Sequence, residues 1–333
     1  MTEKIRVGVI MGGPSSEYEV SLATGENVLK HLDRRIFEPV KIKIFRDGKV
    51  WVRGRYAKLE KAVKDNTDIC FLATHGEFGE DGRLQALLES FGIPYTGSGI
   101  LASALAMNKA KSRQLFSING LKIPKTLILK ERENFQSQLN FFVTKAVKMP
   151  VVVKPCSRGS SVGVSIVKQK RFLKKAIQSA FKYDPEVLIE EYISGREFTC
   201  GVIEKKTNGV CEPVALPVTE IIPSREYDFF DYDAKYKAGA TEEIIPAPIN
   251  EHLYKEIQEA AKKAHLTLGC KDYSRSDFLV KKGKVYILEL NTLPGLTGTS
   301  LIPKALEVHG WSIKKFLTNL CLNHINYEVH LDK

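Results

Sequence analysis

Hydrophobic and polar positions alternate in two different rhythms over the first hundred residues. A short apolar run at Arg6–Met11 predicts a buried strand, and a helical pattern extends from about Glu17 to Leu32. Further strands are predicted near Phe37–Phe45 and Asp68–Ala73, with a helix over Arg83–Phe91. This order is typical of a doubly wound α/β domain built on a parallel sheet.

The turn after the first strand, GGPSSEYEVS, is rich in glycine and serine. Ser16 and Glu19 have the spacing of a capping box at the start of the helix. The turn matches neither the dinucleotide fingerprint G-x-G-x-x-G nor the phosphate loop G-x-x-x-x-G-K-[ST], so neither of these sites is predicted.

Turn chemistry at Pro94–Ser98 interrupts this pattern. Beyond it we expect a helix that carries Lys109, a helical stretch over Lys122–Lys130 and a strand at Pro150–Lys154. That strand enters VVVKPCSRGSSVGVSIV, where β-branched residues flank a loop of serine and glycine on both sides. The loop therefore connects two strands instead of opening a helix.

This serine–glycine loop has two interpretations. Its backbone N–H groups and the hydroxyls of Ser157, Ser160 and Ser161 would form a cradle for an anion, to which Lys154 adds a positive charge. The alternative is a flexible hairpin loop without a ligand. The apolar surroundings of Lys154 favour the cradle, because a lysine in a buried strand needs an anionic partner.

The second half of the chain combines regular elements with two long irregular segments. Strands are predicted at Val187–Ile189 and from Glu197 to Glu204, and a helix over Glu251–Thr267. The irregular segment FFDYDAKYKAGATEEII is rich in tyrosine and charge, and NTLPGLTGTSLIP precedes a terminal helix. Long loops of this kind inside compact domains are usually functional.

The segment SRSDFLVKKGKVYILELNT predicts an antiparallel hairpin, because two β-rich runs flank a Lys-Gly-Lys turn signal. If Lys282–Lys284 forms the loop, Asp277 lies opposite Glu289, and Arg275 lies opposite Asn291. All four side chains then share one face, since side chains alternate along a strand. A two-residue turn would instead put the two acids on opposite faces.

Two carboxylates directly across a strand pair repel each other, which indicates a cation between them. Oxygen ligands without sulfur or imidazole suit Mg²⁺ or Mn²⁺ better than zinc. The competing interpretation is a solvated polar face with scattered acids. The opposite face of the hairpin is predicted to form a core layer of Phe278, Val280, Tyr286, Leu288 and Leu290.

The composition is that of an ordinary globular protein, with 43% hydrophobic and 27% charged residues. At 333 residues the chain is long for one domain, so two or three are expected. Neither a run of about 18 apolar residues nor a signal-peptide pattern occurs, so no membrane association is expected. The six cysteines include no Cys-x-x-Cys pair, which favours reduced thiols in the cytoplasm over disulfides or a zinc site.

The formal net charge of +11 has two interpretations, a nucleic-acid surface or a site that attracts a small polyanion. No basic cluster has the interleaved aromatic residues of a strand-binding surface. Several lysines near Lys168 instead have the pattern of a solvated helix face. We therefore expect no nucleic-acid partner.

Eight stretches of the chain occur in the order and at the spacing found in one family. From Val7 to Pro303 the sequence resembles the D-alanine–D-alanine ligases, which belong to the ATP-grasp superfamily. One such stretch alone would be weak evidence, but eight in register are specific. The stretches are GGPSSEYEVSL, HGEFGEDG, PYTGSGILASALAMNK, VVVKPCSRGSSVGVS, LIEEYISGREFT, DYDAKY, SRSDFLV and ELNTLPGLTGTSLIP.

The resemblance implies a fold of mixed α/β and α+β class. An N-terminal doubly wound parallel-sheet domain, called pre-ATP-grasp, would span residues 1–97. A two-part ATP-grasp fold would follow, with a central subdomain at 98–189 that carries the phosphate loop and a C-terminal subdomain at 190–333 that carries the metal site. The resemblance also implies a homodimer that uses ATP and D-alanine to make D-alanyl-D-alanine for peptidoglycan.

By resemblance, Lys109 and Lys154 would contact the phosphates of ATP. Ser160 and Ser161 would lie at the tip of the loop that closes over them, and Lys235 would reach the transferred phosphate. The adenine and ribose would be bound by Glu190, Glu191, Tyr192, Ile193 and Glu197.

The same resemblance implies that Asp277, Glu289 and Asn291 hold two Mg²⁺ or Mn²⁺ ions. The carboxylate of a first D-alanine would attack the terminal phosphate of ATP to give an acylphosphate, whose carbonyl is then attacked by the amine of a second D-alanine. Arg275 and the backbone N–H of Gly295 would stabilise the oxyanion that forms.

The substrate contacts are likewise implied by resemblance. Glu17 would hold the ammonium of the first D-alanine in a network with Ser160 and Tyr236. Tyr236 also favours this dipeptide over the nearest alternative product, D-alanyl-D-lactate. Arg158 departs from the family pattern, because many relatives carry an acid or a small residue there. His75 would lie beside the first substrate. Ser300 and the N–H of Leu301 would hold the carboxylate of the second.

Overall fold

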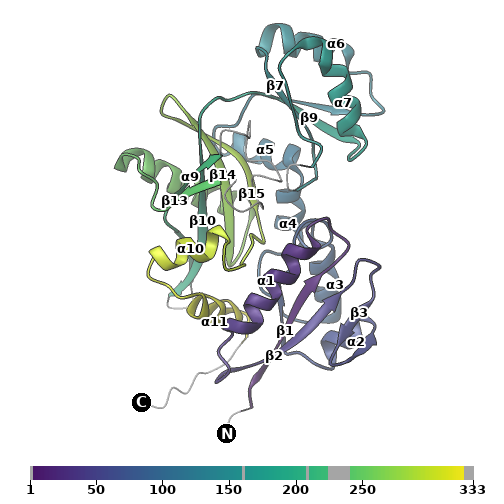
Figure 1. Cartoon of the computed structure of the whole chain (residues 1–333), viewed down its shortest axis with the longest axis vertical. Coiled ribbons are helices and arrows are strands. Elements are labelled where there is room, and N and C mark those ends of the chain that lie inside the picture. Colours follow the sequence, from purple (N-terminus) through teal and green to yellow (C-terminus); the bar gives the residue numbers. More distant parts are fainter. Residues whose placement is uncertain (1–2, 160–161, 208–209, 224–240, 326–333) are drawn as a thin grey trace.

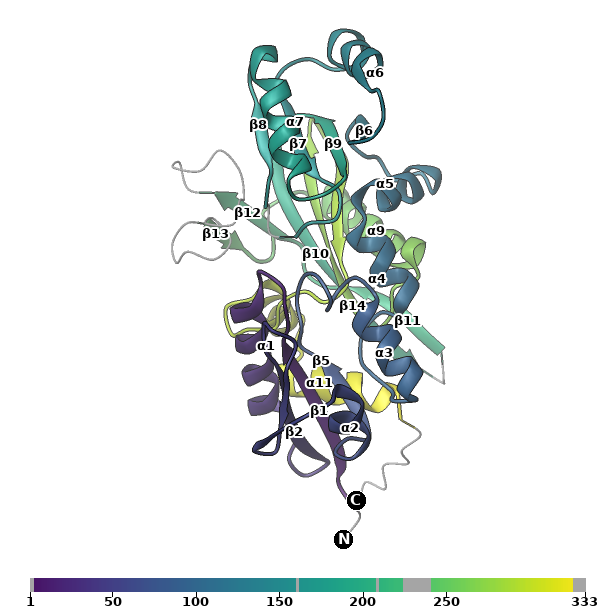
Figure 2. The same ribbon diagram turned by 90° about the vertical axis from the view of Figure 1, so that its right-hand side faces the viewer.

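A computed structural model of the chain describes residues 3–159, 162–207, 210–223 and 241–325. Within these ranges the strands form three sheets, which follow one another along the long axis of the molecule in Figures 1 and 2. Residues Ile5–Gly12 and Ile313–Asn323, near the two ends of the described chain, both lie in the lower part of both views. The architecture confirms the predicted α/β and α+β class, whereas the domain boundaries at 97 and 189 stay predictions.

The first sheet lies in the N-terminal part of the chain and has a parallel centre. Its strands are β1 (Ile5–Gly12), β2 (Phe37–Ile44), β3 (Val50–Val52), β4 (Arg55–Ala57) and β5 (Ile69–Leu72). β1 pairs in parallel with β2 and β5, whereas β3 and β4 extend the β2 edge in antiparallel fashion. The parallel centre confirms the predicted doubly wound domain. Its helices are α1 (Tyr18–His31), α2 (Leu59–Lys64) and α3 (Arg83–Phe91).

The start of α1 differs from the predicted capping box of Ser16 and Glu19. The helix begins one residue later than a Ser16 cap requires, with Glu17 at the N-cap and no hydrogen bond from its side chain to the helix. The hydroxyl of Ser15 instead accepts a hydrogen bond from the N–H of Glu17 at 3.1 Å. The Glu17 carboxylate is therefore not used as a helix cap.

The second sheet is antiparallel and lies at the upper end of Figure 1. Its strands, in spatial order, are β6 (Thr126–Lys130), β9 (Glu186–Glu191), β7 (Val151–Pro155) and β8 (Ser165–Val167). The predicted helical stretch over Lys122–Lys130 is wrong throughout, because Lys122–Lys125 is irregular and Thr126–Lys130 is strand β6. Pro124 removes an N–H that a helix would need, and the run Thr126–Lys130 instead pairs with β9.

Short helices accompany this sheet and connect it to the rest of the chain. They are α4 (Ile100–Met107), α5 (Lys109–Ile118), α6 (Gln136–Phe141) continued by the π-helical turn η1 (Phe142–Ala146), the 3₁₀ turn η2 (Lys170–Phe172) and α7 (Leu173–Phe181). Apolar residues of α6, η1 and α7 form one buried cluster with β7 and β9. The sheet therefore has a core of its own.

The third sheet supplies the predicted hairpin. Its strands are β10 (Arg196–Thr207), β11 (Val210–Ala215), β12 (Thr219–Pro223), β13 (Thr241–Ile244), β14 (Tyr273–Lys281) and β15 (Lys284–Asn291). Helix α9 (Glu251–Leu268) packs against it, as predicted to within one residue. The Asn250 side chain caps α9 by accepting a hydrogen bond from the N–H of Leu253.

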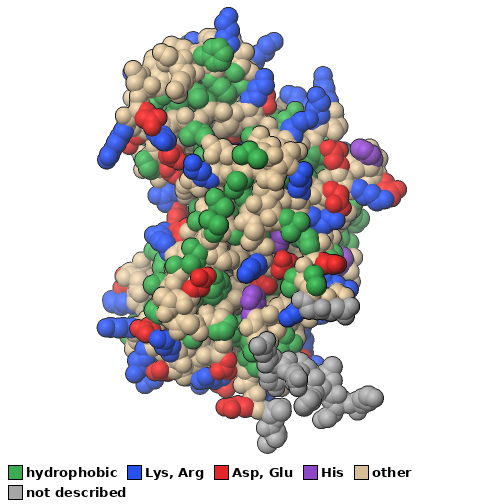
Figure 3. All heavy atoms as spheres, turned by 180° about the vertical axis from the view of Figure 1, so that it is seen from behind, with side chains coloured by type: hydrophobic (Ala, Val, Ile, Leu, Met, Phe, Trp, Pro, Cys, Tyr) green, Lys and Arg blue, Asp and Glu red, His purple; other side chains and the backbone are tan. Residues whose placement is uncertain are grey.

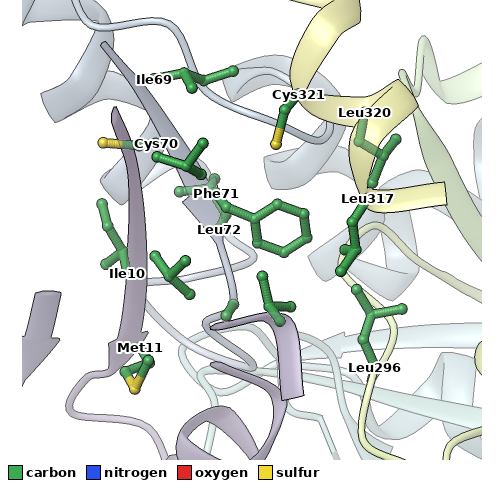
Figure 4. Close-up of a cluster of buried hydrophobic side chains, with 14 of the residues drawn as sticks. Ile10, Met11, Ile69, Cys70, Phe71, Leu72, Leu296, Leu317, Leu320 and Cys321 are labelled. Carbon is green, nitrogen blue, oxygen red and sulfur yellow. The ribbon is translucent and has the colours of Figure 1, made fainter. Parts of the chain in front are cut away.

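The last part of the chain that the structure describes forms two helices where the pattern predicts one. Helix α10 (Leu301–Val308) and helix α11 (Ile313–Asn323) are separated by Gly310, whose φ of 83° ends the first of them. Apolar side chains of α11 return to the first sheet, and Figure 4 shows Leu317 and Cys321 around Phe71 of β5. Segments from both ends of the chain thus share one core.

The surface features agree with the composition. In the described part of the chain, no helix is both long and apolar enough to cross a membrane. All six cysteines lie in that part and are free thiols. On the face in Figure 3, Lys and Arg side chains are spread among acidic and apolar ones along the molecule.

Candidate active site

The hairpin of β14 and β15 brings four polar residues together as predicted. Asp277 pairs with Glu289, and Arg275 pairs with Asn291. The Arg275 guanidinium makes two hydrogen bonds of 3.0 Å to the Asp277 carboxylate, and the amide nitrogen of Asn291 lies 3.4 Å from the same group. The hydroxyl of Thr199, on the neighbouring strand β10, lies 2.7 Å from Asp277 Oδ1. These contacts fix the orientation of a nearly buried carboxylate.

The turn of this hairpin differs from the prediction. Lys281 pairs with Lys284, so the loop contains only Lys282 and Gly283, both with positive φ as a tight hairpin turn requires. Such a turn alone would have moved the acids to opposite faces. A β-bulge at Leu288 adds one unpaired residue and restores the predicted register beyond it.

The same bulge changes which residues face the core. Val285 and Ile287 are buried, whereas Tyr286 and Leu288, which were predicted to be in the core layer, are partly exposed. Tyr286 lies under the ammonium of Lys122, and Leu288 lines a cavity described below. The prediction was correct for the remaining members of the layer, Phe278, Val280 and Leu290.

The oxygen donors for a divalent ion are two carboxylates and one amide. Among the described residues no three His, Cys, Asp or Glu side chains converge as metal ligands, so this smaller set is the candidate. Asp277, Glu289 and Asn291 lie on one face, and each acid has a basic side chain close by. Such a small set of oxygen ligands from the protein suits Mg²⁺, because this ion completes its shell with water and phosphate.

Lys109 lies where two cavities meet. It begins α5, which is capped by Asn108, and its ammonium lies 3.3 Å from the Glu289 carboxylate. The same ammonium donates a hydrogen bond of 2.8 Å to the carbonyl of Arg158, in the loop after β7. Lys109 and Glu289 line both cavities, one of about 500 Å³ and one of about 450 Å³.

The larger cavity, which we call the nucleotide cavity, lies between the second and third sheets. Its walls include an apolar set suited to a flat ring: Val152, Val164, Ile166, Ile221, Leu279 and Leu288. Its polar lining contains the predicted residues Lys109, Lys154, Glu190, Glu191, Tyr192, Ile193, Glu197, Asp277 and Glu289. The structure thus brings together every predicted ATP residue that it describes.

Lys154 and Glu190 form a buried ion pair in this cavity, with 2.7 Å between Nζ and Oε2. Arg113 of α5 is also buried and lies 2.9 Å from the other Glu190 oxygen. Burial would raise the pKa of the Glu190 carboxyl, but the charges of Arg113 and Lys154 outweigh burial and hold it below its usual value. Burial lowers the pKa of the Lys154 ammonium, and Glu190 opposes that shift in part.

The smaller cavity, which we call the substrate cavity, lies between the first and third sheets. The predicted residues that line it are Glu17, His75, Lys109, Arg275, Glu289, Asn291, Gly295, Ser300 and Leu301. It also contains Gly159 from the loop after β7, whose Cβ position would be 3.1 Å from Glu17 Oε2. The phosphate-loop backbone therefore lies directly against the Glu17 carboxylate.

His75 and Glu80 form a second buried pair, in the substrate cavity. The His75 ring donates from Nδ1 to the carbonyl of Leu293 at 2.9 Å, and its Nε2 lies 2.8 Å from the Thr24 hydroxyl. Burial would lower the pKa of His75, but the Glu80 carboxylate at 3.7 Å, with help from Glu17, raises it. Burial raises the pKa of Glu80 above its usual value, and nearby Glu17 adds to that shift.

The loop before α10 forms the far end of the substrate cavity. A Cβ at Gly295 would lie 2.9 Å from the Ser300 hydroxyl, so only glycine permits this close approach. Ser300 is the N-cap of α10, and its hydroxyl accepts a hydrogen bond from the N–H of Thr297 rather than capping the helix. The N–H of Leu301 is the first of the helix, where an anion is favoured.

Four predicted site residues lie outside the described residues: Ser160, Ser161, Lys235 and Tyr236. The network of Glu17 with Ser160 and Tyr236 therefore stays a prediction.

Sequence reasoning missed two charged residues beside the predicted site, Arg113 and Glu80, and one ion pair, that of Arg158 with Glu77. Arg113 lies four residues after Lys109 on one helix face, and two buried bases at this spacing could have indicated a shared anionic partner. The ion pair of Arg158 with Glu77 joins residues 81 positions apart, which no local pattern connects.

A cavity of about 500 Å³ between two β-sheets, which meets a second cavity at Lys109 and Glu289, is the arrangement expected of an ATP-dependent ligase of the ATP-grasp class. Family models agree with this class. The model described as D-ala D-ala ligase C-terminus matches residues 115–322, and the model described as D-ala D-ala ligase N-terminus matches 6–67 and 56–98. The chain belongs to the D-alanine–D-alanine ligase family.

Individual relatives show the extent of the similarity. A D-alanine–D-alanine ligase of Syntrophobacter fumaroxidans is 43% identical over 319 residues, which cover 96% of this chain and 97% of the relative. The structure of the VanG D-Ala:D-Ser ligase from Enterococcus faecalis is similar with a TM-score of 0.83 at 31% identity, covering 97% of this chain and all of that one. The D-alanine–D-alanine ligase from Bacillus anthracis complexed with ATP gives 0.79 at 34% identity, covering 96% and 97%.

Proposed function

We propose that this protein joins two molecules of D-alanine into D-alanyl-D-alanine, with conversion of ATP to ADP and phosphate, to supply peptidoglycan synthesis. The observation that carries the proposal is the meeting of the two cavities at Lys109 and Glu289. A phosphoryl donor in one cavity and an amino acid in the other would meet at this point. The catalytic contribution is then mainly positioning and charge stabilisation.

In the nucleotide cavity, the apolar walls take the adenine and the backbone of Glu191–Ile193 bonds its edge. Glu197 accepts from the ribose hydroxyls, and Lys109 and Lys154 bind phosphates. Glu190 keeps Lys154 charged and oriented, since their ion pair is buried. Ser160, Ser161 and Lys235 complete the phosphate contacts in this proposal.

Two Mg²⁺ or Mn²⁺ ions are proposed at Asp277, Glu289 and Asn291, whose oxygen donors fit such ions. When bound, these ions neutralise negative charge on the phosphates. The chain prepares the site by holding the Asp277 carboxylate through Thr199 and Arg275.

In the substrate cavity, Glu17 binds the ammonium of the first D-alanine and His75 lies beside that substrate. The substrate carboxylate attacks the terminal phosphate, ADP leaves, and an acylphosphate forms. Ser160 and Tyr236 are proposed to hold Glu17 in place. His75 is kept in position by Leu293 and Thr24.

The second D-alanine is held by its carboxylate at Ser300 and the N–H of Leu301. Its amine attacks the acylphosphate carbonyl, loses a proton, and expels phosphate. Arg275 and the N–H of Gly295 stabilise the oxyanion of the tetrahedral intermediate, an effect worth about 3–4 kcal/mol per donor. Both donors line the substrate cavity.

The acceptor distinguishes the principal alternatives. A solved relative is named a D-Ala:D-Ser ligase, and D-lactate would give a depsipeptide by the same chemistry. Offering D-alanine, D-serine and D-lactate together at neutral pH, with products separated by mass, tests the choice. We expect D-alanyl-D-alanine as the main product, and predominance of another product would overturn the proposal.

The primary test is phosphate release from ATP with D-alanine, against L-alanine and no amino acid. Release that depends on D-alanine supports the proposal. Retention on DNA at roughly physiological salt without such turnover would instead support a nucleic-acid protein, which the charge of +11 alone suggests.

We also propose a cytoplasmic homodimer. The cytoplasm is in keeping with six free thiols, and light scattering of the purified protein tests the dimer.

A further inference from the structure

One ion pair joins the phosphate loop to the first sheet between the two cavities. Arg158, in the loop between β7 and β8, places Nη1 2.5 Å from Oε1 of Glu77, which follows β5. The two residues are 81 positions apart and belong to segments of different sheets. Their contact therefore spans the boundary between the nucleotide and substrate halves of the molecule.

Other contacts hold the same loop residue from the nucleotide side. Arg158 Nε donates to the carbonyl of Tyr183 at 2.9 Å, and the carbonyl of Arg158 accepts from the ammonium of Lys109 at 2.8 Å. The N–H of Ser157 donates to Asp184 at 2.6 Å. Among these contacts, the one with Glu77 reaches the segment that follows β5, so it ties the loop to that side of the substrate cavity.

The distance that this contact controls is that between the loop and Glu17. Gly159 directly follows Arg158, and its Cβ position would lie 3.1 Å from Glu17 Oε2. A loop held at Glu77 thus keeps its backbone beside the proposed ammonium-binding carboxylate. Release of Arg158 would widen the substrate cavity at this wall, because Gly159 forms part of its lining.

We infer that Arg158 and Glu77 form a latch between two sheets, in which both act as positioning residues that hold Ser157–Gly159 against Lys109 and Glu17 and so increase the affinity for D-alanine. This inference rests on the proposed function. The side chains are 39% and 22% exposed, so their attraction is partly screened by solvent. An ion pair of this kind changes the ratio of molecules with the loop held at Glu77 to those with it released by roughly twofold to fivefold.

Cleavage by trypsin tests the latch independently of any ligase activity. The protease has to bind the Arg158 side chain, which the ion pair with Glu77 holds. We expect Glu77→Gln to increase the rate of cleavage between Arg158 and Gly159 by about twofold to fivefold in the absence of ligands, followed by mass spectrometry. The matched control is Glu38→Gln, which breaks an exposed ion pair with Arg53 inside the first sheet. Equal cleavage in wild type and Glu77→Gln would overturn the latch.

Steady-state kinetics tests whether the latch acts on substrate binding. We expect Glu77→Gln and Arg158→Gln each to raise the KM for D-alanine by about twofold to fivefold, with kcat changed less than about twofold, since saturating substrate restores the closed population. The double variant should match either single variant, because both remove the same contact. Arg158→Lys should recover part of the effect.

The outcomes separate the latch from its alternatives. A rise in the KM for ATP in Arg158→Gln alone, with Glu77→Gln unchanged, would mean that Arg158 contacts the nucleotide directly and would overturn the latch. Wild-type protein without D-alanine-dependent phosphate release would reject the proposed function. Faster trypsin cleavage in Glu77→Gln would even then support the loop contact itself.

Discussion

Each cavity contains a glutamate with little exposure to solvent, and the pKa values of the two carboxyls shift in opposite directions. In the nucleotide cavity, Arg113 and Lys154 outweigh the effect of burial and hold the pKa of Glu190 below its usual value. In the substrate cavity, burial and the charge of Glu17 raise the pKa of Glu80, although His75 lies beside it. Burial raises the pKa of Glu80, but at Glu190 the two neighbouring cations reverse the direction of the shift.

This difference fits the ligands that we propose for the two halves. The nucleotide half holds a fixed arrangement of charged groups, in which buried Glu190 contacts both Arg113 and Lys154. The substrate half brings Glu17, His75 and Glu80 together beside Lys109 and Arg275, and the pKa values of both His75 and Glu80 are raised there. We expect the first half to respond to loss of a charge and the second to respond to pH.

The largest effect should come from Glu289, because this residue lines both cavities and its loss would affect both halves of the molecule. Glu289→Gln should lower D-alanine-dependent phosphate release by about 1000-fold or more, because an amide replaces a charged oxygen ligand. The melting temperature should change little. Activity within tenfold of wild type would refute the assignment of Glu289 as a metal ligand.

Arg113→Met should test the nucleotide half by leaving Glu190 with one cation instead of two. We expect a loss of about 3 kcal/mol in the free energy of unfolding, because breaking a buried ionic network leaves a charge poorly compensated. Urea unfolding at pH 7 measures it. The matched change in the substrate half, Glu80→Gln, should cost far less, and an equal loss in both variants would contradict the contrast.

The pH dependence of stability should differ between the halves. A raised folded pKa at Glu80 means that the folded state holds the proton longer, so its contribution falls as pH rises above the usual value of 4.5. Glu190 behaves oppositely, and its contribution is lost as pH falls below 4.5. Comparison of urea unfolding at pH 5 and pH 8 should show a smaller decline in Glu80→Gln than in wild type. An identical decline would mean that Glu80 does not titrate in this window.

The smallest effects should come from two matched threonine changes. Thr199→Val removes a hydroxyl from Asp277, and we expect the Mg²⁺ concentration for half-maximal activity to rise about tenfold. Thr24→Val removes a hydroxyl from His75, and we expect the KM for D-alanine to rise about fivefold. Each variant should leave the other parameter near its wild-type value. Identical kinetic changes in both would show that the two halves are not separately tuned.

The predictable part of this molecule is the part that local pattern determines. The first sheet and helix α9 follow from hydrophobic periodicity, and Lys154 follows from its charge in an apolar strand, whereas Lys109 was assigned only from the family resemblance. The hairpin register was correct although its turn was not, because a two-residue turn and a bulge cancel. Alternation counted from the turn gave the wrong core residues at Tyr286 and Leu288 for the same reason.

What pattern could not show are contacts between distant segments. Arg113 meets Glu190 across 77 residues, and Arg158 meets Glu77 across 81. Strand β6 was predicted to be a helix, because the pairing of Thr126–Lys130 with β9 cannot be seen in the local sequence. In each case the partner, and not the residue itself, decides the structure.

The packing of α11 on the first sheet has a consequence for synthesis on the ribosome. The backbone pairing of β1, β2 and β5 can form early, but Phe71 and its neighbours stay without part of their cover until Leu317 and Cys321 have been translated. The nascent chain thus carries an exposed apolar surface through most of its elongation, a state in which chaperones commonly act. Helix α11 thus completes a hydrophobic core to which β1 already contributes.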